Sequence, residues 1–114
     1  MRRGEIWQVD LDPARGSEAN KSRPAVIVSN DRANATAERL ARGVVTVVPV
    51  TSNVDRIYPF QVLLTAHDGL SVDSKAQAEQ VRSVASDQLL FRLGRLSLRE
   101  LRDLDEALRL HLAL

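Results

Sequence analysis

The sequence has 114 residues and no cysteine, which excludes disulfide bonds, a thiolate nucleophile and any zinc site built on cysteine. Only two histidines occur, and both are expected to be structural: His67 stands before a turn, and His111 lies among leucines of a helical segment. The five glycines lack the spacing of a phosphate-binding loop, and no pair of carboxylates stands out as a hydrolytic or metal site. We therefore expect neither a metal ion nor a cofactor.

Long apolar runs are also missing. No stretch of the sequence approaches the roughly 20 apolar residues of a membrane-spanning helix. The opening segment Met1-Arg2-Arg3-Gly4-Glu5 has a basic pair without an apolar stretch behind it, so we expect no signal peptide. These two absences predict a cytoplasmic protein that does not bind membranes.

The residues that are present have an ordinary globular composition, with 44% hydrophobic and 27% charged side chains. The length fits a single domain over residues 1–114. The net charge of +1 is close to neutral and neither favours nor excludes a nucleic-acid partner. Basic residues do gather in the first quarter of the chain, where a local surface could bind a polyanion. They are Arg2, Arg3, Arg15, Lys21 and Arg23.

Alternating or β-branched apolar residues predict several short strands. The predicted strands cover residues 4–11, 24–29, 44–50, 58–64, 75–84 and 93–96. Residues 12–22 contain Pro, Gly, Ser and Asn without periodicity and are predicted to form a long loop. Thr51-Ser52-Asn53 and Asp68-Gly69 are predicted turns.

Two helices are predicted in addition. The first runs from Asp31 to about Ala41, with Ser29 or Asn30 as its cap. The second begins at the capping box Ser97-Leu98-Arg99-Glu100. Its leucines recur at helical spacing and form a stripe that can dock on a sheet. They are Leu98, Leu101, Leu104, Leu108 and Leu112. Strands first and a helix last predict a mainly β fold, a small curled sheet or barrel with flanking helices.

Two polar residues at strand ends are candidates for chemistry. Arg23 directly precedes the predicted strand at 24–29, and Thr51 directly follows the one at 44–50. If these strands share a sheet, both side chains emerge at its rim. An arginine grips a phosphate with a planar fork of donors, and a hydroxyl beside it can donate to a phosphate oxygen. Such a pair suits the attack of an RNA 2′-hydroxyl on its own phosphate. The same sequence pattern would arise if Arg23 were only a surface cation and Thr51 only the last residue of a strand.

Seven segments of the sequence share the order and spacing of a known family. They are Arg3-Gly4-Glu5-Ile6-Trp7 with Val9-Asp10-Leu11, Gly16-Ser17-Glu18, Arg23-Pro24, Val28-Ser29-Asn30-Asp31, Val48-Pro49-Val50-Thr51-Ser52, Glu79-Gln80-Val81-Arg82-Ser83-Val84 and Leu104-Asp105-Glu106-Ala107-Leu108. None of them is specific alone. Together they resemble the MazF/PemK toxins of type II toxin–antitoxin systems over nearly the whole chain.

This resemblance implies a small curled antiparallel sheet, CcdB-like and related to SH3-like barrels, with a C-terminal helix. It also implies a homodimer and a cognate antitoxin as partner. The implied activity is the cleavage of single-stranded RNA, mRNA included, at short sequences and without a metal. The implied products carry a 2′,3′-cyclic phosphate and a 5′-hydroxyl.

The resemblance assigns roles to individual residues. Arg23 is expected to bind the scissile phosphate, and Thr51 to donate to the developing oxyanion. Glu18 is expected either to orient Arg23 or to accept the proton of the 2′-hydroxyl. Further residues are expected to bind RNA: Ser17, Lys21, Ser52, Asn53, Gln80 and Arg82. Aromatic residues make up only 4%, and Trp7 and Phe60 are expected in the core or a dimer contact, so recognition would rely on hydrogen bonds more than on base stacking.

Two alternative functions fit the same fold. One is a toxin that acts on another target such as a topoisomerase, and the other is a regulator that binds nucleic acid without cutting it. The fold alone does not choose among them. The combination of Arg23-Pro24 with Thr51 favours RNA cleavage, because a protein that only binds needs no such pair.

Overall fold

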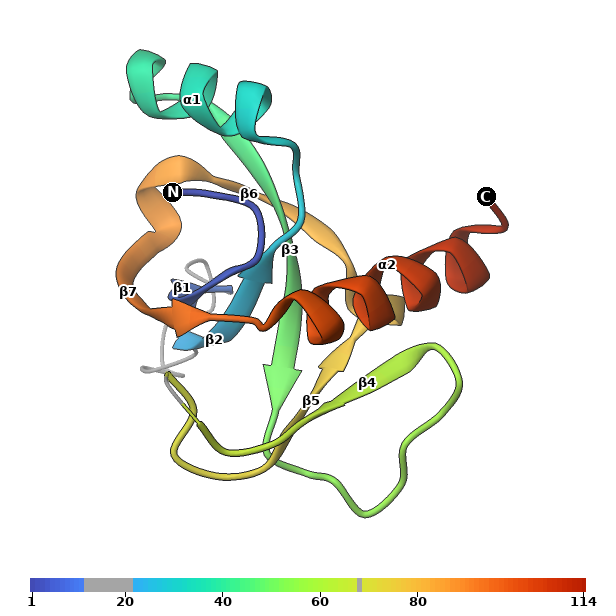
Figure 1. Ribbon diagram of the computed structural model, residues 1–114. Helices are drawn as coiled ribbons and strands as arrows, with labels where there is room; N and C mark the ends of the chain where they lie inside the picture. The colour runs from blue at the N-terminus through green and yellow to red at the C-terminus, as the bar shows by residue number, and fades with distance from the viewer. Residues whose placement is uncertain (12–21, 68) are drawn as a thin grey trace.

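A computed structural model describes residues 1–11, 22–67 and 69–114. The strands are β1 (Glu5–Asp10), β2 (Ser22–Ile27), β3 (Val44–Thr51), β4 (Gln61–Leu64), β5 (Ser74–Gln77), β6 (Arg82–Ala85) and β7 (Leu89–Arg95). The helices are α1 (Asp31–Leu40) and α2 (Leu98–Leu112), with short 3₁₀ turns η1 (Ala78–Gln80) and η2 (Ser86–Gln88) (Figure 1). The predicted loop at 12–22, apart from Ser22, and Asp68 of the predicted turn lie outside the described residues.

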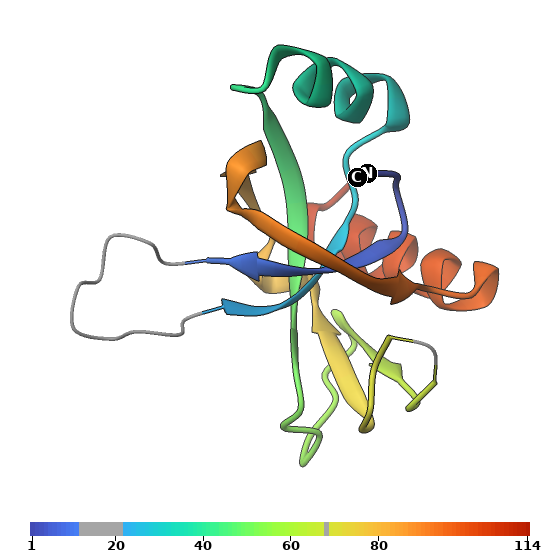
Figure 2. The same ribbon diagram turned by 90° about the vertical axis from the view of Figure 1, so that its left-hand side faces the viewer.

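The strands form one antiparallel sheet in the order β4-β5-β3-β2-β1-β7, with β6 paired to β3 as well. Figure 2 shows the twist of this sheet, because β1 and β7 run across the direction of β3. In the described part of the chain β4 and β7 do not pair with each other, so the sheet stays open. The predicted small antiparallel sheet with flanking helices is confirmed, in the open form and not as a closed barrel.

Each face of the sheet has its own apolar core. One core joins Ile6, Val26 and Val48 to Leu104 and Ala107 of α2. The other core joins further strand residues to Ala37 of α1. Because side chains alternate along a strand, neighbours such as Val47 and Val48 enter different cores. The two helices therefore cover opposite faces, with α1 beside the beginning of β3 (Figures 1 and 2).

Both predicted helices are confirmed with their caps. Asn30 accepts a hydrogen bond from the Ala33 N–H, and Ser97 forms a capping box with Glu100. The leucine stripe of α2 is only partly buried: Leu104 is 0% exposed, but Leu98 is 70% exposed. Leu112, at 48%, is exposed as well, because a helix of 15 residues, about 22 Å long, extends past the strands it covers. None of the described helices is long and apolar enough to cross a bilayer.

The predicted strand at 75–84 is wrong in its middle. The chain forms β5 and β6 with η1 between them, and both strands pair with β3. Between the residues paired to β6 and those paired to β5, strand β3 contains Pro49, which has no N–H to offer a further partner. The interruption and the proline therefore coincide.

Two other boundaries differ from the prediction. The strand expected from residue 58 begins at Gln61, because Gln61 N donates to the Tyr58 carbonyl at 2.8 Å and closes a turn. The last strand is longer than 93–96, since β7 begins at Leu89 and pairs with β1. The turn after His67 is present, with Gly69 at φ +94°. His67 lies in solvent as expected, with its Nε2 3.0 Å from a Glu100 carboxylate oxygen.

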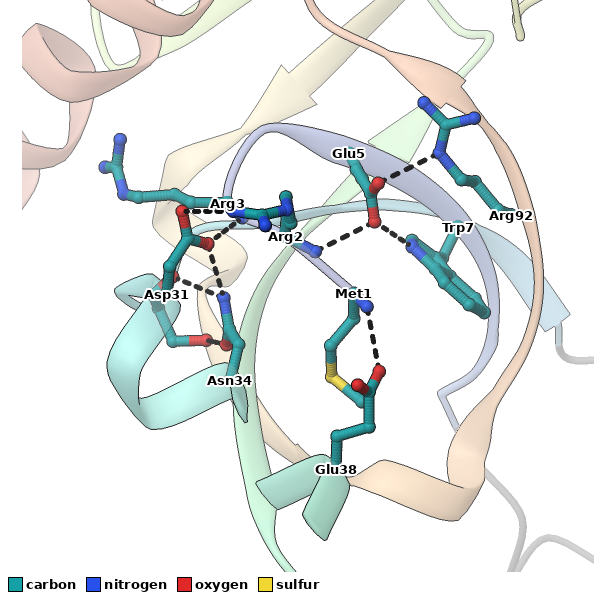
Figure 3. A network of polar contacts seen from close by, with 10 residues as sticks. Met1, Arg2, Arg3, Glu5, Trp7, Asp31, Asn34, Glu38 and Arg92 are labelled. Carbon is teal, nitrogen blue, oxygen red and sulfur yellow. Dashed lines mark hydrogen bonds and ion pairs between the residues drawn. The ribbon is translucent and has the colours of Figure 1, made fainter. Parts of the chain in front are cut away.

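A network of polar contacts joins the first residues of the chain to α1 and β7 (Figure 3), and Arg3 also contacts α2. The Arg3 guanidinium binds the Val28 carbonyl and Asp105 of α2, and the Arg3 N–H donates to Asp31 of α1. On β1, Glu5 accepts hydrogen bonds from the Arg2 N–H and from Trp7 Nε1 and pairs with Arg92 of β7. Trp7, half-buried, packs against the core that includes Ala37.

Glu5 makes the stability of this network dependent on pH. Burial raises the pKa of its carboxyl, but hydrogen bonds from Trp7 and Arg2 and nearby positive charges, including that of Arg92, outweigh burial and lower the pKa below its ordinary value. A carboxyl whose folded pKa is depressed stabilises the fold above its unfolded pKa. That contribution is lost as the pH falls through the folded pKa.

We predict that Glu5→Gln lowers the free energy of unfolding at about pH 7 and weakens its decrease between about pH 7 and pH 3.5. The measurement is urea unfolding followed by the fluorescence of Trp7 at both pH values. Asp87→Asn, which removes an exposed carboxylate from η2, is the control. A Glu5→Gln variant whose stability depends on pH as strongly as that of the unmodified protein would contradict the assignment.

Candidate active site

Strands β2 and β3 carry Arg23 and Thr51 at the same end. Their antiparallel register pairs Ala25 with Pro49 and Val26 with Val48. Arg23 and Thr51 each lie two residues beyond the last paired residues, Ala25 and Pro49, at the same end of the two strands. Arg23 is exposed and Thr51 is half-buried, so both side chains reach the surface at this end of the two strands. The sequence alone left open whether these strands share a sheet, and the structure shows that they are direct neighbours.

Arg23 and Thr51 also share a face of the sheet. In β2, Arg23 alternates in phase with Ala25 and Ile27, and these belong to the core on the face opposite α2. In β3, Thr51 is in phase with Val47 of the same core. Helix α1 covers this face only near the other end of β3 (Figure 2). The end that carries Arg23 and Thr51 is therefore not covered by either helix.

Thr51 begins a turn in which its hydroxyl oxygen accepts a hydrogen bond from the backbone. The Asn53 N–H donates to Thr51 Oγ1 at 3.2 Å, and the Asp55 N–H donates to Asn53 Oδ1 at 3.2 Å. Short polar side chains favour such local bonds to the following backbone. The Asn53 N–H occupies one lone pair of Oγ1, and a hydroxyl that accepts such a bond can still donate its own proton to a ligand. Ser52 and Asn53, both exposed, follow directly, so the predicted turn is confirmed and its side chains face solvent.

Gln80 and Arg82 lie on the other edge of β3. Gln80 ends η1 and Arg82 begins β6, where it is paired with Val47 and so shares the face of Arg23 and Thr51. The Arg82 guanidinium donates to Gln80 Oε1 at 3.1 Å and to the Gln80 carbonyl at 3.3 Å. Both residues are exposed. The structure therefore holds these two predicted RNA-binding residues together, although Gln80 lies on a turn and not on a strand.

Three other predicted site residues cannot be placed. Ser17, Glu18 and Lys21 lie outside the described residues. Their expected roles, an acid or base for Glu18 and RNA binding for Ser17 and Lys21, stay predictions.

Sequence reasoning missed a hollow of about 240 Å³ beside Thr51 and Ser52. Its lining is mostly apolar and comes from Pro24, Val50, Leu93 and the segment from Gly69 to Ser74. The return of this segment to β3 is a tertiary contact, and no local pattern in the sequence predicts it. Its apolar lining belongs to the α2 face of the sheet, and the hollow reaches Thr51 and Ser52 at the end of β3.

The described residues contain no group of three or more histidine, aspartate or glutamate side chains close enough to share a metal ion. His111, the second histidine, lies at the end of α2 with its ring 6.4 Å from the Phe60 ring. Arg23, Thr51, Gln80 and Arg82 are all donors to an anion, which suits a negatively charged ligand.

Comparison with known proteins finds relatives along nearly the whole chain. Residues 2–112 match the family described as PemK-like, MazF-like toxins of type II toxin–antitoxin systems. The Mycobacterium tuberculosis endoribonuclease MazF9 is 73% identical over 100% of this chain and 98% of its own length. A probable endoribonuclease MazF from Mycolicibacterium smegmatis is 36% identical over 95% of this chain and 93% of its own.

Solved structures of other proteins have a similar fold. An endoribonuclease from a mycobacterial species, solved in complex with its cognate antitoxin, superimposes with a TM-score of 0.78 at 24% identity, over 100% of this chain and 96% of that one. At this identity the match concerns the fold. The family match covers nearly the whole sequence, and the chain belongs to the PemK-like, MazF-like toxins of type II toxin–antitoxin systems.

Proposed function

We propose that this protein is a toxin that cleaves single-stranded RNA at short specific sequences, without a metal ion. The broad class, an endoribonuclease toxin, follows from membership of the family and from 73% identity to MazF9 along the full chain. The observation that supports the cleavage chemistry is that Arg23 and Thr51 lie on the same face of two neighbouring strands, at an end that neither helix covers.

The reaction we propose uses the nucleophile of the RNA itself. The 2′-oxygen attacks the adjacent phosphorus, the bond from phosphorus to the 5′-oxygen breaks, and a 2′,3′-cyclic phosphate and a 5′-hydroxyl result. The 2′-hydroxyl gives up a proton to a base, and the leaving 5′-oxygen gains one. The protein contributes mainly by placing donors where negative charge accumulates at phosphorus.

Arg23 and Thr51 supply these donors in the proposal. The Arg23 fork binds the non-bridging oxygens, while Thr51, whose oxygen already accepts the Asn53 N–H, turns its proton toward the phosphate. A guanidinium stays protonated in proteins, so Arg23 stabilises charge and is a poor base. Glu18 is the candidate to orient Arg23 or to take the 2′-hydroxyl proton.

The remaining predicted residues would bind the RNA on either side of the cut. Ser52 and Asn53 are exposed next to Thr51, and Gln80 with Arg82 forms a second donor group on the far edge of β3. Ser17 and Lys21 would contribute from residues 12–21. We propose that the hollow beside Thr51 receives an apolar edge or ring of the substrate.

We also propose a cytoplasmic homodimer with a cognate antitoxin as partner. Several leucines of α2 and the residues after it are exposed, among them Leu110 at 58% and Leu114 at 85%. Exposed apolar side chains of this size commonly mark contacts with partners. Two subunits would present two Arg23 sites to an extended RNA strand. An antitoxin that covers them would block RNA by occlusion.

The direct test of the cleavage chemistry is to map RNA ends. Incubation of the pure protein with a long RNA in excess EDTA is expected to give discrete cuts whose downstream fragments begin with a 5′-hydroxyl. Replacement of the 2′-hydroxyl at the cut position by hydrogen is expected to prevent cleavage, because the nucleophile is then missing. Loss of activity in EDTA, with recovery on adding magnesium or zinc, would overturn the metal-independent mechanism.

Variants at the two central residues test the assignment of donors. Arg23→Ala and Thr51→Val are each expected to lower the cleavage rate by about 10²–10³, the usual cost of losing one preorganised donor to a transition state. Circular dichroism should show the fold retained, because neither side chain belongs to a core. Arg102→Ala, which removes an exposed charge from α2, is the matched control and should cleave normally. Normal turnover by a folded Arg23→Ala variant would remove that residue from the mechanism.

The dimer is tested by sedimentation velocity at micromolar protein. We expect a single species with twice the mass of the chain, because the exposed leucines need a partner surface. A monomer that keeps its full specific activity over a wide dilution range would contradict the proposal.

A further inference from the structure

Lys75 is a nearly buried cation that the proposed reaction does not use. The chain has 16 lysine and arginine residues, and only Lys21 and Lys75 are lysines. Lys75 is 8% exposed, although a charged side chain normally stays in water unless a partner offsets the cost of its burial. Its ammonium donates a hydrogen bond of 2.7 Å to the backbone carbonyl of Arg56. An arginine would bring a bulkier planar group to this place, whereas an ammonium is compact.

The position of Lys75 in the sheet connects it to the proposed active site. It is the direct cross-strand partner of Thr51 in the β3–β5 pairing, so the two side chains share a face. On its other side β5 pairs with β4, and Leu63 is the partner of Lys75 there. Lys75 therefore sits between β3 and β4, and the carbonyl that it binds belongs to the segment 52–60 that joins these two strands.

Segment 52–60 is held by polar bonds along its whole length. It begins with the Asn53 and Asp55 turns that follow Thr51. It ends with Gln61, whose Oε1 accepts the Tyr58 N–H at 3.1 Å and whose Nε2 donates to Glu79 at 2.6 Å. The bond from Lys75 to Arg56 holds the middle. Hydrogen bonds thus hold the segment at Thr51 and at Gln61, and Gln61 connects it to Glu79, the residue before Gln80.

A stack of side chains supports the same segment from outside. The Tyr58 and Phe60 rings are parallel with centroids 5.4 Å apart, and the Arg56 guanidinium carbon lies 5.7 Å from the Tyr58 centroid. The Arg56 side chain also donates to the Tyr58 hydroxyl at 3.2 Å. The Arg56 carbonyl faces Lys75 while its guanidinium joins the stack, so the Lys75 bond fixes the residue on which the stack is built.

We propose that Lys75 is a positioning residue for RNA binding, which holds segment 52–60 so that Ser52 and Asn53 are presented to the substrate beside Thr51. This inference rests on the proposed function of the Thr51 site. The ammonium is bonded to the Arg56 carbonyl and little of the residue is exposed, so we assign Lys75 to the segment and not to a phosphate. Its effect is to order the segment before RNA binds, so that binding does not have to supply the cost of ordering.

The test compares Lys75→Met with the unmodified protein. Methionine keeps most of the length and apolar stem of lysine but cannot donate to Arg56. We expect KM for an oligoribonucleotide substrate to rise about tenfold, the scale of losing one charge-assisted hydrogen bond, and kcat to stay within about twofold. Thr51 remains in the β3–β5 pairing, which is why kcat is spared. Hydrogen exchange of the Asn53 and Asp55 amides is expected to become faster.

The controls separate position from charge and from stability. Arg102→Met removes one positive charge from α2 and should leave KM and the exchange rates unchanged. The thermal midpoint of Lys75→Met should change little, because exchanging a buried charge for an apolar side chain of similar volume is often neutral or stabilising. Should Lys75→Met fail to fold, Lys75→Arg replaces it, with changes of the same sign and smaller size.

An unchanged KM and unchanged amide exchange in a folded Lys75→Met protein would overturn the inference while the unmodified protein still cleaves RNA. A rise in KM without faster exchange would also overturn it, because Lys75 would then act on RNA directly. If the unmodified protein does not cleave RNA, the proposed function fails, and the inference about RNA fails with it. That result is distinguishable, since the amide exchange still reports whether Lys75 holds the segment.

Discussion

Strand β3 binds three other strands, and this sharing of its two edges is the constraint on which the rest of the structure depends. One edge pairs with β2, and the other pairs first with β6 and then with β5. The β2 pairing puts Arg23 and Thr51 at the same end of two neighbouring strands. The β5 pairing places Lys75 beside Thr51, and the β6 pairing turns Arg82 to the same face. Residues from four strands thus share one face because a single strand connects them.

The two faces of the sheet serve different purposes. The face under α2 is closed by apolar packing around Leu104, and the opposite face is closed by α1 only near the beginning of β3. This leaves the end of β3 open to solvent without exposing the core. The polar network around Arg3 and Glu5 supports the arrangement from the N-terminal side, since it connects β1 to α1, α2 and β7.

Much of this fold could be predicted from sequence because the signals were local. The Asn30 and Ser97 caps, the apolar strand leading to Thr51 and the turn after it depend on neighbouring residues, and they were confirmed. The errors arose where distant contacts decide the outcome. Residues 75–84 read as one strand, yet η1 divides them where they pass Pro49 on the neighbouring strand. The contact of Lys75 could not be predicted from the sequence, because its partner is a backbone carbonyl that only folding brings near.

The open sheet has a consequence for how the protein behaves at high concentration. A strand with one free edge offers unpaired backbone groups to other molecules, and such edges promote aggregation when they are long and uncharged. At one edge of the sheet, strand β4 has only four residues and begins shortly after Pro59. At the other edge, β7 exposes Leu90 and Phe91 but also carries the exposed Arg92 and Arg95. Charged side chains at a free edge oppose pairing with another chain, so any redesign of this surface should keep a charge at that edge.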